Sequence, residues 1–469
     1  MDQQSGISSC DFDVAVVGSG PGGFEAAVLA AREGLRVCVI EKGEVGGVCV
    51  NWGCIPTKAL LRSAGMFRLA GEAGQFGLVT GETSVDITQA VKRSRRVVLT
   101  VSKGVEYSLK QSGVVLKRGE AAFVDARTLE IRREGQEPET VRAEHIVIAT
   151  GARARELPGL PVDGGTIITS REALALKEAP GKMLIVGGGA IGVEMAWYFS
   201  SAGTEVTLVE LMPRIMPLED EEISEGLKRS LEKTGITVLT GATVLGADKR
   251  EDGVTVAVRT ADGEERSFDS SCVLLAVGVS ANTGDLRLER AGVVVERGFI
   301  RTDGRCRTDA RHVFAIGDVR GGMLLAHKAS AEAEIAVQAI AGKQTAALDE
   351  TRIPRCVYVE PSVASVGLSE EQARNEGYEV AVGKAMFSAS GKASAYGNRE
   401  GFVKLVFDAD SWVMLGGHVL GHDAVELIGE LTLARSLDAT AHQILGAIHA
   451  HPTLSESVRE AAGNAVREG

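Results

Sequence analysis

The feature that most constrains this chain is a glycine-rich segment that occurs twice. Each copy follows a short apolar run and precedes a helical stretch, and a second apolar run then closes on a glutamate. The glycines are Gly18, Gly20 and Gly23 in the first copy and Gly187, Gly189 and Gly192 in the second. The closing acids, Glu41 and Glu210, each lie 23 residues after the first glycine of their copy. The shared spacing predicts an internal repeat of a strand–helix–strand unit.

Each copy has the residues that a bound dinucleotide needs. The first glycine makes the turn, the second lets the backbone approach a pyrophosphate, and the third allows close packing of helix on strand. The phosphates then lie at a helix N-terminus, and the acid is placed to bind ribose hydroxyls. A simple glycine turn is the alternative, but it does not account for the strands, helix and acid that accompany the motif twice. The chain is therefore expected to bind two dinucleotides.

The second acid also predicts which nicotinamide dinucleotide is used. A carboxylate at Glu210 repels a 2′-phosphate, whereas NADP binding favours an arginine there. Residues 211–213 read Leu-Met-Pro, and the next base is Arg214. The sequence therefore favours NAD at the second site.

Length and composition limit the class of protein. The 469 residues predict about three domains, and a net charge of −12 with 4% aromatic residues argues against a nucleic-acid partner. No run approaches the roughly 18 apolar residues that cross a membrane, and the N-terminal MDQQSGISSC has no feature of an export signal. The 7 cysteines are an odd number and mostly scattered in apolar runs. They predict a reducing compartment and a cytoplasmic location.

The order of the segments predicts how the domains are divided. A first nucleotide domain is expected at residues 10–151 and again at 280–349, where the chain returns through the run HVFAIGD. A second, at 152–279, is inserted between these parts. The last part, 350–469, changes to alternating strands followed by helices and is expected to form a separate domain. Between the two repeat copies, residues from about 54 to 112 have a helical pattern.

A third motif, GGVCVNWGCIPTK at residues 46–58, carries Cys49 and Cys54. Their spacing is not the C-x-x-C of a zinc site and no second pair is nearby, so no metal site is expected. Pro56 suits the first turn of a helix, which places Cys54 near the helix N-terminus, where a thiolate is stabilised. A non-helical lead-in could bring the two cysteines within disulfide range. The alternative is that both are buried structural thiols.

The segment HAHPTLSE, residues 449–456, predicts an acid–base pair. A thiol substrate with a pKa of about 8.5 needs a base of pKa about 6.5–7 to form its thiolate at neutral pH. His451 is the candidate base, and Glu456 is the candidate carboxylate that orients its ring. Thr453 and Glu456 also fit a capping box at the start of a helix, so the acid could have only that structural role. His449 is equally compatible with a structural role.

Nearly the whole chain resembles the pyridine nucleotide–disulfide oxidoreductases, and GGVCVNWGCIPTK is similar to their redox-active segment. The resemblance implies an α/β fold with two Rossmann-like dinucleotide-binding domains, for FAD and for NAD, and a C-terminal α+β dimerisation domain. FAD would bind in the domain formed by residues 10–151 and 280–349, and NAD in the inserted domain. Cys49 and Cys54 would form a redox disulfide, with Cys54 facing the flavin and Cys49 exchanging with the substrate.

The resemblance also implies further cofactor contacts. Lys58 and Glu194 would pair beside the flavin ring, although the residues alone also allow two unrelated charges on solvated faces. The residues implied to contact FAD are Thr150, Gly151, Asp318 and Ala326, and those implied to line the NAD pocket are Val244 and Gly278. The family often reads G-R-x-P-N where this chain has Val-Ser-Ala between Gly278 and Asn282. The contact there is expected to differ in detail.

Within the family, HAHPTLSE and the run MLLAHKA resemble members that oxidise protein-bound dihydrolipoamide with NAD. By this resemblance the protein would be a homodimer in which His451 serves the partner's active site. Its substrate would be carried by a lipoyl-bearing subunit of a 2-oxoacid dehydrogenase complex or of the glycine cleavage system. Glu210 disfavours members that use NADPH, such as glutathione reductase. Two alternatives stay open: another disulfide substrate, or a flavin-binding scaffold subunit without catalysis. Neither nucleic acid nor a membrane is an expected partner.

Overall fold

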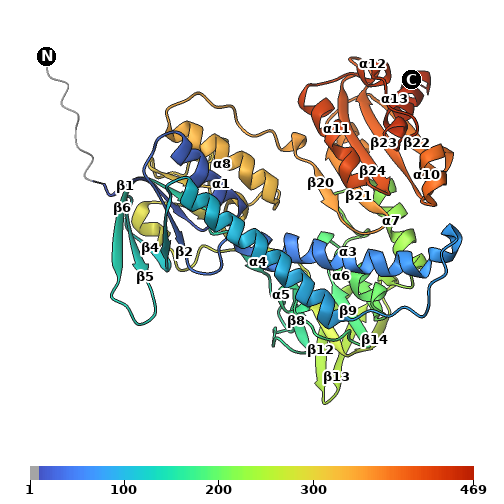
Figure 1. The fold of residues 1–469 in the computed structure, drawn as a ribbon, viewed down its shortest axis with the longest axis horizontal. Coiled ribbons are helices and arrows are strands. Elements are labelled where there is room, and N and C mark those ends of the chain that lie inside the picture. Colours follow the sequence, from blue (N-terminus) through green and yellow to red (C-terminus); the bar gives the residue numbers. More distant parts are fainter. Residues whose placement is uncertain (1–9, 469) are drawn as a thin grey trace. The chain divides into compact units, whose positions relative to one another are not determined.

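The computed structural model describes residues 10–468. Residues 1–9, to which the expectation about an export signal applies, and Gly469 lie outside the described part. The chain forms two compact units (Figure 1). The first comprises residues 10–57, Lys92–Arg153 and Val279–Leu348, and the second comprises Lys58–Val91, Ala154–Gly278 and residues 349–468.

A mostly parallel sheet is the centre of the first unit. Its strand order is β3-β2-β1-β6-β5-β4, with β19 also paired to β6. The C-terminal half of β6 pairs in parallel with both β1 and β19, and its N-terminal half pairs antiparallel with β5. The strands are β1 (Phe12–Val17), β2 (Val37–Glu41), β3 (Val115–Arg118), β4 (Glu120–Asp125), β5 (Thr128–Arg132), β6 (Glu139–Ile148) and β19 (Val313–Ala315). The helices are α1 (Pro21–Arg32), α2 (Gly47–Trp52), α8 (Ala326–Ile340) and, from Lys92 onward, α4 (Ile87–Gln111).

Both faces of this sheet are buried, which explains why its strands read as continuous apolar runs. On β1, Val14 and Val16 pack into a cluster that includes residues of α1 and α8. The alternate residues, Ala15 and Val17, pack into a second cluster around Phe123. The strand–helix–strand unit predicted for the first glycine motif is therefore present as β1, α1 and β2.

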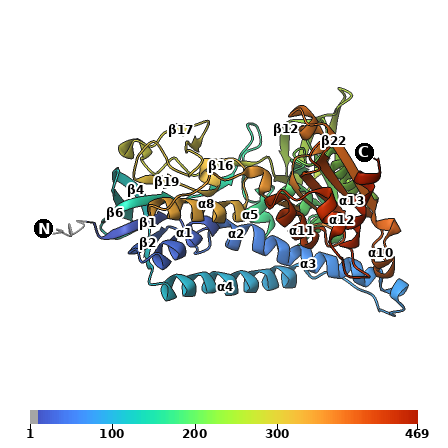
Figure 2. The ribbon, with the colours of Figure 1, turned by 90° about the horizontal axis from the view of Figure 1, so that it is seen from above.

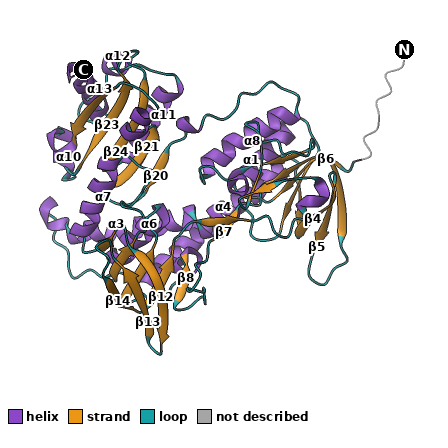
Figure 3. Ribbon diagram, turned by 180° about the vertical axis from the view of Figure 1, so that it is seen from behind, coloured by secondary structure: helices purple, strands orange, loops and turns teal. Residues whose placement is uncertain are grey.

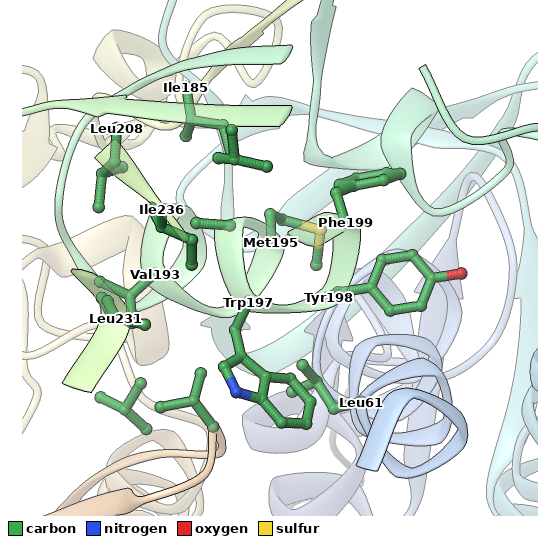
Figure 4. Packing of buried hydrophobic residues seen from close by; sticks show 14 of the residues in the cluster. Leu61, Ile185, Val193, Met195, Trp197, Tyr198, Phe199, Leu208, Leu231 and Ile236 are labelled. Carbon is green, nitrogen blue, oxygen red and sulfur yellow. The ribbon is translucent and has the colours of Figure 1, made fainter. Parts of the chain in front are cut away.

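The second unit contains another parallel sheet, of order β11-β10-β9-β15-β8, and an antiparallel sheet β12-β13-β14 (Figure 3). The strands are β8 (Ile167–Thr169), β9 (Lys182–Val186), β10 (Glu205–Val209), β11 (Thr237–Leu239), β12 (Thr243–Arg250), β13 (Gly253–Arg259), β14 (Glu265–Ser270) and β15 (Cys272–Leu275). The helices are α5 (Ser170–Ala173), α6 (Ala190–Ser201), α7 (Glu221–Lys233) and, from Lys58 onward, α3 (Cys54–Gly71). Helix α6 is buried at every position from Gly192 to Phe199. Figure 4 shows its side chains among residues of the sheet and of α3.

The C-terminal part of the second unit is a five-stranded antiparallel sheet of order β20-β21-β24-β23-β22. The strands are β20 (Arg355–Val357), β21 (Ser362–Gly367), β22 (Val380–Met386), β23 (Gly401–Asp408) and β24 (Met414–Gly421), and the helices are α9 (Glu370–Asn375), α10 (Gly391–Tyr396), α11 (Ala424–Ser436), α12 (Ala441–Gly446) and α13 (Glu456–Glu468). Helix α13 packs closely on β22, because a Cβ at Gly383 would lie 1.9 Å from the carbonyl oxygen of Ala461. Strands and helices alternate after residue 350, while the expected separate domain at 350–469 stays a prediction.

The second strand–helix–strand unit is present as β9, α6 and β10. The helical pattern from 54 to 112 is two helices, α3 and α4, separated by a 3-10 turn at Ala73–Phe76 and a loop at 77–86. Among residues 10–468, no helix combines the length and the apolar character that crossing a membrane requires. The division into an FAD domain (10–151 and 280–349), an NAD domain (152–279) and a C-terminal domain (350–469) stays a prediction.

Candidate active site

The first glycine motif forms a tight connection between β1 and α1. Gly18 has a φ of +101°, and a Cβ there would lie 2.4 Å from the carbonyl oxygen of Ala149. A Cβ at Gly23 would lie 2.1 Å from the carbonyl oxygen of Gly18. The helix can approach the strand this closely only with glycine at both positions. Gly20 differs, because a Cβ there would meet no atom within 4 Å, so the space beside it is open.

The second motif repeats this steric pattern. Gly187 has a φ of +108°, and its Cβ would lie 2.3 Å from the carbonyl oxygen of Ala276. A Cβ at Gly192 would lie 1.9 Å from the carbonyl oxygen of Gly187, whereas one at Gly189 would meet nothing within 4 Å. In each motif the first and third glycines serve the fold, and the middle glycine faces open space.

The carboxylate of Glu41 is held by hydrogen bonds from Ser19 and Gly43. Its Oε2 accepts hydrogen bonds from the N–H and the Oγ–H of Ser19, at 2.8 and 2.6 Å. Its Oε1 accepts one from the N–H of Gly43 at 2.7 Å. The carboxylate therefore joins the glycine loop to the loop after β2.

Glu210 is held in the same way in the second motif. Its Oε2 accepts from the N–H of Gly188 at 2.5 Å, and its Oε1 accepts from the N–H of Met212 at 2.7 Å. Each carboxylate oxygen has a second acceptor position, so the acid can still bind ribose hydroxyls. Leu211 and Met212 follow it as exposed apolar residues, with 64% and 47% of their surface accessible. Neither supplies a cation for a 2′-phosphate.

Both helices that follow the glycine loops begin without a side-chain cap. Gly20 is the N-cap of α1 and Gly189 is the N-cap of α6, and neither start has a capping hydrogen bond from a side chain. Their first backbone N–H groups and the open space at the middle glycine fit a pyrophosphate. The residues present therefore fit one dinucleotide at each motif.

Cys49 and Cys54 lie on two consecutive helices of the redox segment. Cys49 is in α2, and Cys54 is the first residue of α3. The expected non-helical lead-in is therefore wrong, while the position of Cys54 at a helix start is confirmed. The helices are separated by Gly53, whose φ of −143° and ψ of −112° suit glycine and interrupt the helix. Both cysteines are half-buried.

The redox segment is held by the neighbouring helix α4. The Oγ–H of Ser94 donates to the carbonyl oxygen of Pro56 at 3.1 Å. The guanidinium group of Arg95 lies 4.3 Å from the ring centre of Trp52 and donates to the carbonyl oxygen of Asn51 at 2.8 Å. These contacts fix both the end of α2 and the start of α3.

Lys58 and Glu194, which the resemblance predicts to pair, form an ion pair within the second unit. Nζ of Lys58 lies 2.9 Å from each carboxylate oxygen of Glu194. The side chain of Glu194 is 5% exposed and that of Lys58 is 34% exposed. A buried carboxylate needs such a partner, so the alternative of two charges on solvated faces does not hold for Glu194.

Tyr358 completes this pair and was not predicted from the sequence. Its backbone N–H donates to Oε1 of Glu194 at 3.1 Å, and Nζ of Lys58 lies 4.4 Å from the centre of its ring. The nearby Nε1–H of Trp197 donates to the carbonyl oxygen of Glu360 at 3.1 Å, which ties the same segment to α6. No local pattern in the sequence connects residue 358 to a lysine 300 positions earlier.

His451 and Glu456 form a hydrogen-bonded pair at the start of α13. Nδ1 of His451 lies 2.9 Å from Oε1 of Glu456, and Oε2 of Glu456 accepts from the N–H of Thr453 at 2.9 Å. The two predicted roles of Glu456, orienter and cap, are therefore performed together, one by each oxygen. The Thr453 N–H and then His451 hold the pKa of Glu456 below its ordinary value. An ionised carboxylate only accepts, so Nδ1 carries the hydrogen and neutral His451 has its lone pair on Nε2.

His449 has a different partner. Its Nε2 lies 2.7 Å from Oε1 of Glu430 on α11, and its side chain is 7% exposed. His451, by contrast, has 80% of its side chain exposed. These contacts support the structural alternative for His449.

The remaining predicted FAD residues lie at the ends of elements in the first unit. Thr150 and Gly151 follow β6, and the Oγ–H of Thr150 donates to the carbonyl oxygen of Asn282 at 2.9 Å. The side-chain amide of Asn282 donates in return to the carbonyl oxygen of Thr150 at 2.9 Å. Asp318 lies in the 3-10 turn Gly317–Arg320, and Ala326 is the first residue of α8.

The two predicted NAD-pocket residues lie in the second unit. Val244 is on β12 and half-buried against the core. Gly278 follows β15 with a φ of +96°, and its carbonyl oxygen accepts from the N–H of Arg155 at 3.0 Å. The departure from the family pattern occupies the short strand β16 (Val279–Ala281).

A cluster of buried charged residues near Asp318 was not predicted from the sequence. Glu332 and Lys328, both with fully buried side chains, lie 2.7 Å apart, and Arg320 pairs with the same carboxylate. Glu332 accepts from the N–H of Gly317 at 2.6 Å, which fixes the turn that carries Asp318. Burial raises the pKa of Asp318. The periodic apolar pattern of α8 gave no sign that one lysine and one glutamate point inward.

The predicted site residues are divided between the two units. Cys49, Cys54 and the residues assigned to FAD belong to the first unit. Lys58, Glu194, the second glycine motif and the His451–Glu456 pair belong to the second unit. Within the second unit Lys58 is hydrogen-bonded to Glu194, and His451 is hydrogen-bonded to Glu456.

The comparisons with known proteins cover the chain almost completely. Residues 12–333 match the model of the pyridine nucleotide-disulphide oxidoreductases, and residues 353–462 match their dimerisation domain. A dihydrolipoyl dehydrogenase of Chlorobaculum parvum is 58% identical over 98% of both chains, and one of Chlorobaculum tepidum is 57% identical over 99% of both. One of Bacillus subtilis is 41% identical over 96% of this chain and 97% of its own.

Solved structures show the same fold. LpdA of Mycobacterium tuberculosis superposes with a TM-score of 0.90 at 27% identity, covering 96% of this chain and 98% of its own. The HOCl-induced flavoprotein disulfide reductase RclA of Escherichia coli gives a TM-score of 0.85 at 28% identity, covering 96% and 99%. The chain belongs to the pyridine nucleotide-disulphide oxidoreductase family.

Proposed function

We propose that the protein catalyses the reaction of a dihydrolipoyl dehydrogenase, the oxidation of protein-bound dihydrolipoamide by NAD. The observation that carries the proposal is the 57–58% identity to two proteins of that name over nearly the whole chain. The hydrogen-bonded His451–Glu456 pair supports it, because a dithiol substrate needs a base of this kind.

FAD and NAD are the cofactors of this family. The first glycine loop, Glu41, Thr150–Gly151, Asp318 and Ala326 would hold FAD. The second loop, Glu210, Val244 and Gly278 would hold NAD. When bound, FAD would supply a two-electron acceptor for the reduced cysteine pair, and NAD would supply the final hydride acceptor.

The steps on the protein's own residues follow from thiol–disulfide exchange. One thiolate of the substrate attacks Sγ of Cys49 in the Cys49–Cys54 disulfide and releases Cys54 as a thiolate. The second substrate thiol loses its proton to Nε2 of His451 and attacks the substrate sulfur of the mixed disulfide, which breaks the bond to Cys49 and releases Cys49 as a thiolate. Lipoamide then leaves as a cyclic disulfide, and the cysteine pair holds the two electrons. Glu456 keeps Nδ1 of His451 protonated and stabilises the imidazolium.

We further propose a homodimer. Residues 353–462 match a dimerisation domain. Leu433, Leu437 and Ile448 are exposed apolar residues of this domain, with 60%, 70% and 100% of their surface accessible. Such a group is typical of a subunit interface. In the dimer His451 would act in the partner's active site, and the substrate would arrive on a lipoyl-bearing subunit of a 2-oxoacid dehydrogenase complex or the glycine cleavage system.

A cytoplasmic location is part of the same proposal. Cys38, Cys272 and Cys306 are buried thiols, and burial raises the pKa of each to about 12. Thiols of this kind are inert and need no disulfide partner, as in a reducing compartment.

The test is steady-state NADH formation with dihydrolipoamide. The native protein should turn over rapidly, and Cys54→Ser should abolish turnover, while Cys356→Ala should retain it as a matched control at a thiol outside the redox segment. Turnover with another dithiol but not with dihydrolipoamide would support a related disulfide reductase instead. A protein that binds flavin but oxidises neither would support a scaffold subunit.

A further inference from the structure

Helix α4 presents an exposed basic face. The face consists of Lys92, Arg96, Leu99, Lys103, Tyr107 and Lys110, all of which are exposed. Their spacing of three or four residues places them on one side of a helix. Leu99 and Tyr107 are 55% and 64% exposed, so two large apolar side chains lie among four cations. Figure 2 shows α4 running alongside α1 of the same unit.

The cations of the basic face are not neutralised within the protein. Lys92, Arg96, Lys103 and Lys110 have no side-chain hydrogen bond or ion pair to any of residues 10–468. From Lys92 to Gln111 the helix has one acid, Glu106, which pairs with Arg118 at 2.6 Å. In a chain with a net charge of −12, this local excess of positive charge is unusual. Unpaired cations on an exposed helix face give a local positive charge that an acidic partner would complement, and Leu99 and Tyr107 add apolar contact area beside them.

Residues of α4 outside the basic face attach the helix to the redox segment. Ser94 and Arg95 contact Pro56, Asn51 and Trp52 as described above. About two turns further on, the Oγ–H of Ser102 donates to the carbonyl oxygen of Val45 at 2.8 Å. A partner bound to the basic face is therefore held on the helix that directly supports the segment carrying Cys49 and Cys54.

We propose that the basic face of α4 docks an acidic protein domain that carries the dithiol substrate. The inference rests on the proposed function, because it supplies the binding surface for the carrier that this function requires. Complementary charges on two protein surfaces raise the rate at which the proteins associate and make the association specific. A nucleic acid is the less favoured occupant, since the face has one aromatic side chain and the chain as a whole is acidic.

The experiment compares two triple variants of the full-length holoenzyme. K92E/R96E/K103E reverses the charge of the face. R290E/R305E/R307E makes the same change in net charge at exposed arginines elsewhere in the first unit. The probe is an acidic lipoylated carrier domain. Its Kd is measured by fluorescence anisotropy with the oxidised carrier, and kcat/KM is measured with the reduced carrier and with free dihydrolipoamide.

The face variant should weaken carrier binding at least about tenfold at low ionic strength and abolish its salt dependence. The kcat/KM of the face variant with free dihydrolipoamide should be unchanged. The control triple variant should have the native Kd for the carrier and the native kcat/KM with both substrates. K92Q/R96Q/K103Q should give an intermediate loss and serves if the charge reversal impairs folding.

Three results would overturn the docking proposal: equal carrier binding by the native protein and the face variant, an equal loss in the control triple, or tighter binding of a short DNA duplex than of the carrier through the same face. Absence of turnover with free dihydrolipoamide would overturn the proposed function instead. The anisotropy measurement still decides the docking question in that case.

Discussion

Glu456 lies 2.9 Å from Nδ1 of His451 through one carboxylate oxygen and caps the turn at Thr453 through the other. The same side chain thus positions a base and starts the helix that carries it. His451→Gln should lower kcat with dihydrolipoamide by about 10²–10⁴-fold while leaving bound flavin unchanged, because only proton transfer is lost. Stopped-flow and flavin absorbance measure the two properties. His442→Gln, at an exposed histidine outside the pair, is the control.

Glu456→Gln should affect both functions of the acid. An amide cannot accept from Nδ1 and from the Thr453 N–H with equal strength, because one of its two groups is a donor. We expect kcat to fall by about 10–100-fold, since a neutral amide does not stabilise the imidazolium as a carboxylate does. An unchanged kcat with reduced stability would show that Glu456 acts only as a cap.

Lys58→Met should destabilise the second unit by leaving the buried Glu194 carboxylate without its cation. The expected loss in the free energy of unfolding is about 2 kcal/mol, below the value for a fully buried pair because Lys58 is partly exposed. Urea denaturation measures it. The double variant Lys58→Met/Glu194→Gln should recover most of the loss. Additive losses would mean that the two side chains do not depend on each other.

The middle and third glycines of the second motif should respond differently to alanine. Gly192→Ala should reduce stability by several kcal/mol, because the added Cβ would lie 1.9 Å from the carbonyl oxygen of Gly187. Gly189→Ala meets no atom within 4 Å and should leave stability unchanged, yet it should weaken NAD binding at least about tenfold by filling the space beside the pyrophosphate. Calorimetric unfolding and NAD titration give the two readouts. Normal NAD affinity in Gly189→Ala would contradict the assignment.

His418 should make stability depend on pH below neutrality. It is fully buried on β24, its Nε2 donates to the carbonyl oxygen of Leu368 at 3.0 Å, and Nδ1 has no hydrogen-bond partner among residues 10–468. Burial, with a smaller contribution from Arg355, lowers its pKa from the ordinary 6.5, although the carboxylates of Asp220 and Glu219 oppose this.

The direction of this pH dependence follows from proton binding by the folded and the unfolded protein. As pH falls below about 6.5, unfolded His418 takes up a proton and native His418 does not, so stability is lost by at most about 1.4 kcal/mol per pH unit. Above pH 7 this residue contributes no pH dependence. Urea unfolding between pH 5 and 8 should show a smaller slope in His418→Gln than in the native protein. Equal slopes would mean that other groups carry the effect.

Much of the fold was predictable because particular positions obey local rules. Only glycine fits at Gly18 and Gly23, and the closing acid follows each motif at a fixed distance, so the two strand–helix–strand units could be recognised without any tertiary information. The His451–Glu456 pair was predictable for the same reason, since its members are five residues apart.

The residues that were missed depend on contacts between distant segments. Tyr358 contacts Lys58 from a distant part of the chain. Glu332 forms ion pairs with Lys328 on its own helix and with Arg320 in the turn before that helix. Neither arrangement leaves a periodic pattern. Helix α2 was missed because its six residues, in a glycine-rich segment, are too few to show one.

Glu41 and Glu210 are each anchored to the main chain by two amide groups. Under the proposed function, coenzyme choice at the second motif is a property of the path of the polypeptide and not of one interchangeable side chain. An engineer who wished this protein to accept a 2′-phosphorylated coenzyme would have to rebuild the loop from residue 210 to 214 as a whole. Exchange of the acid alone would leave two main-chain donors without their acceptor.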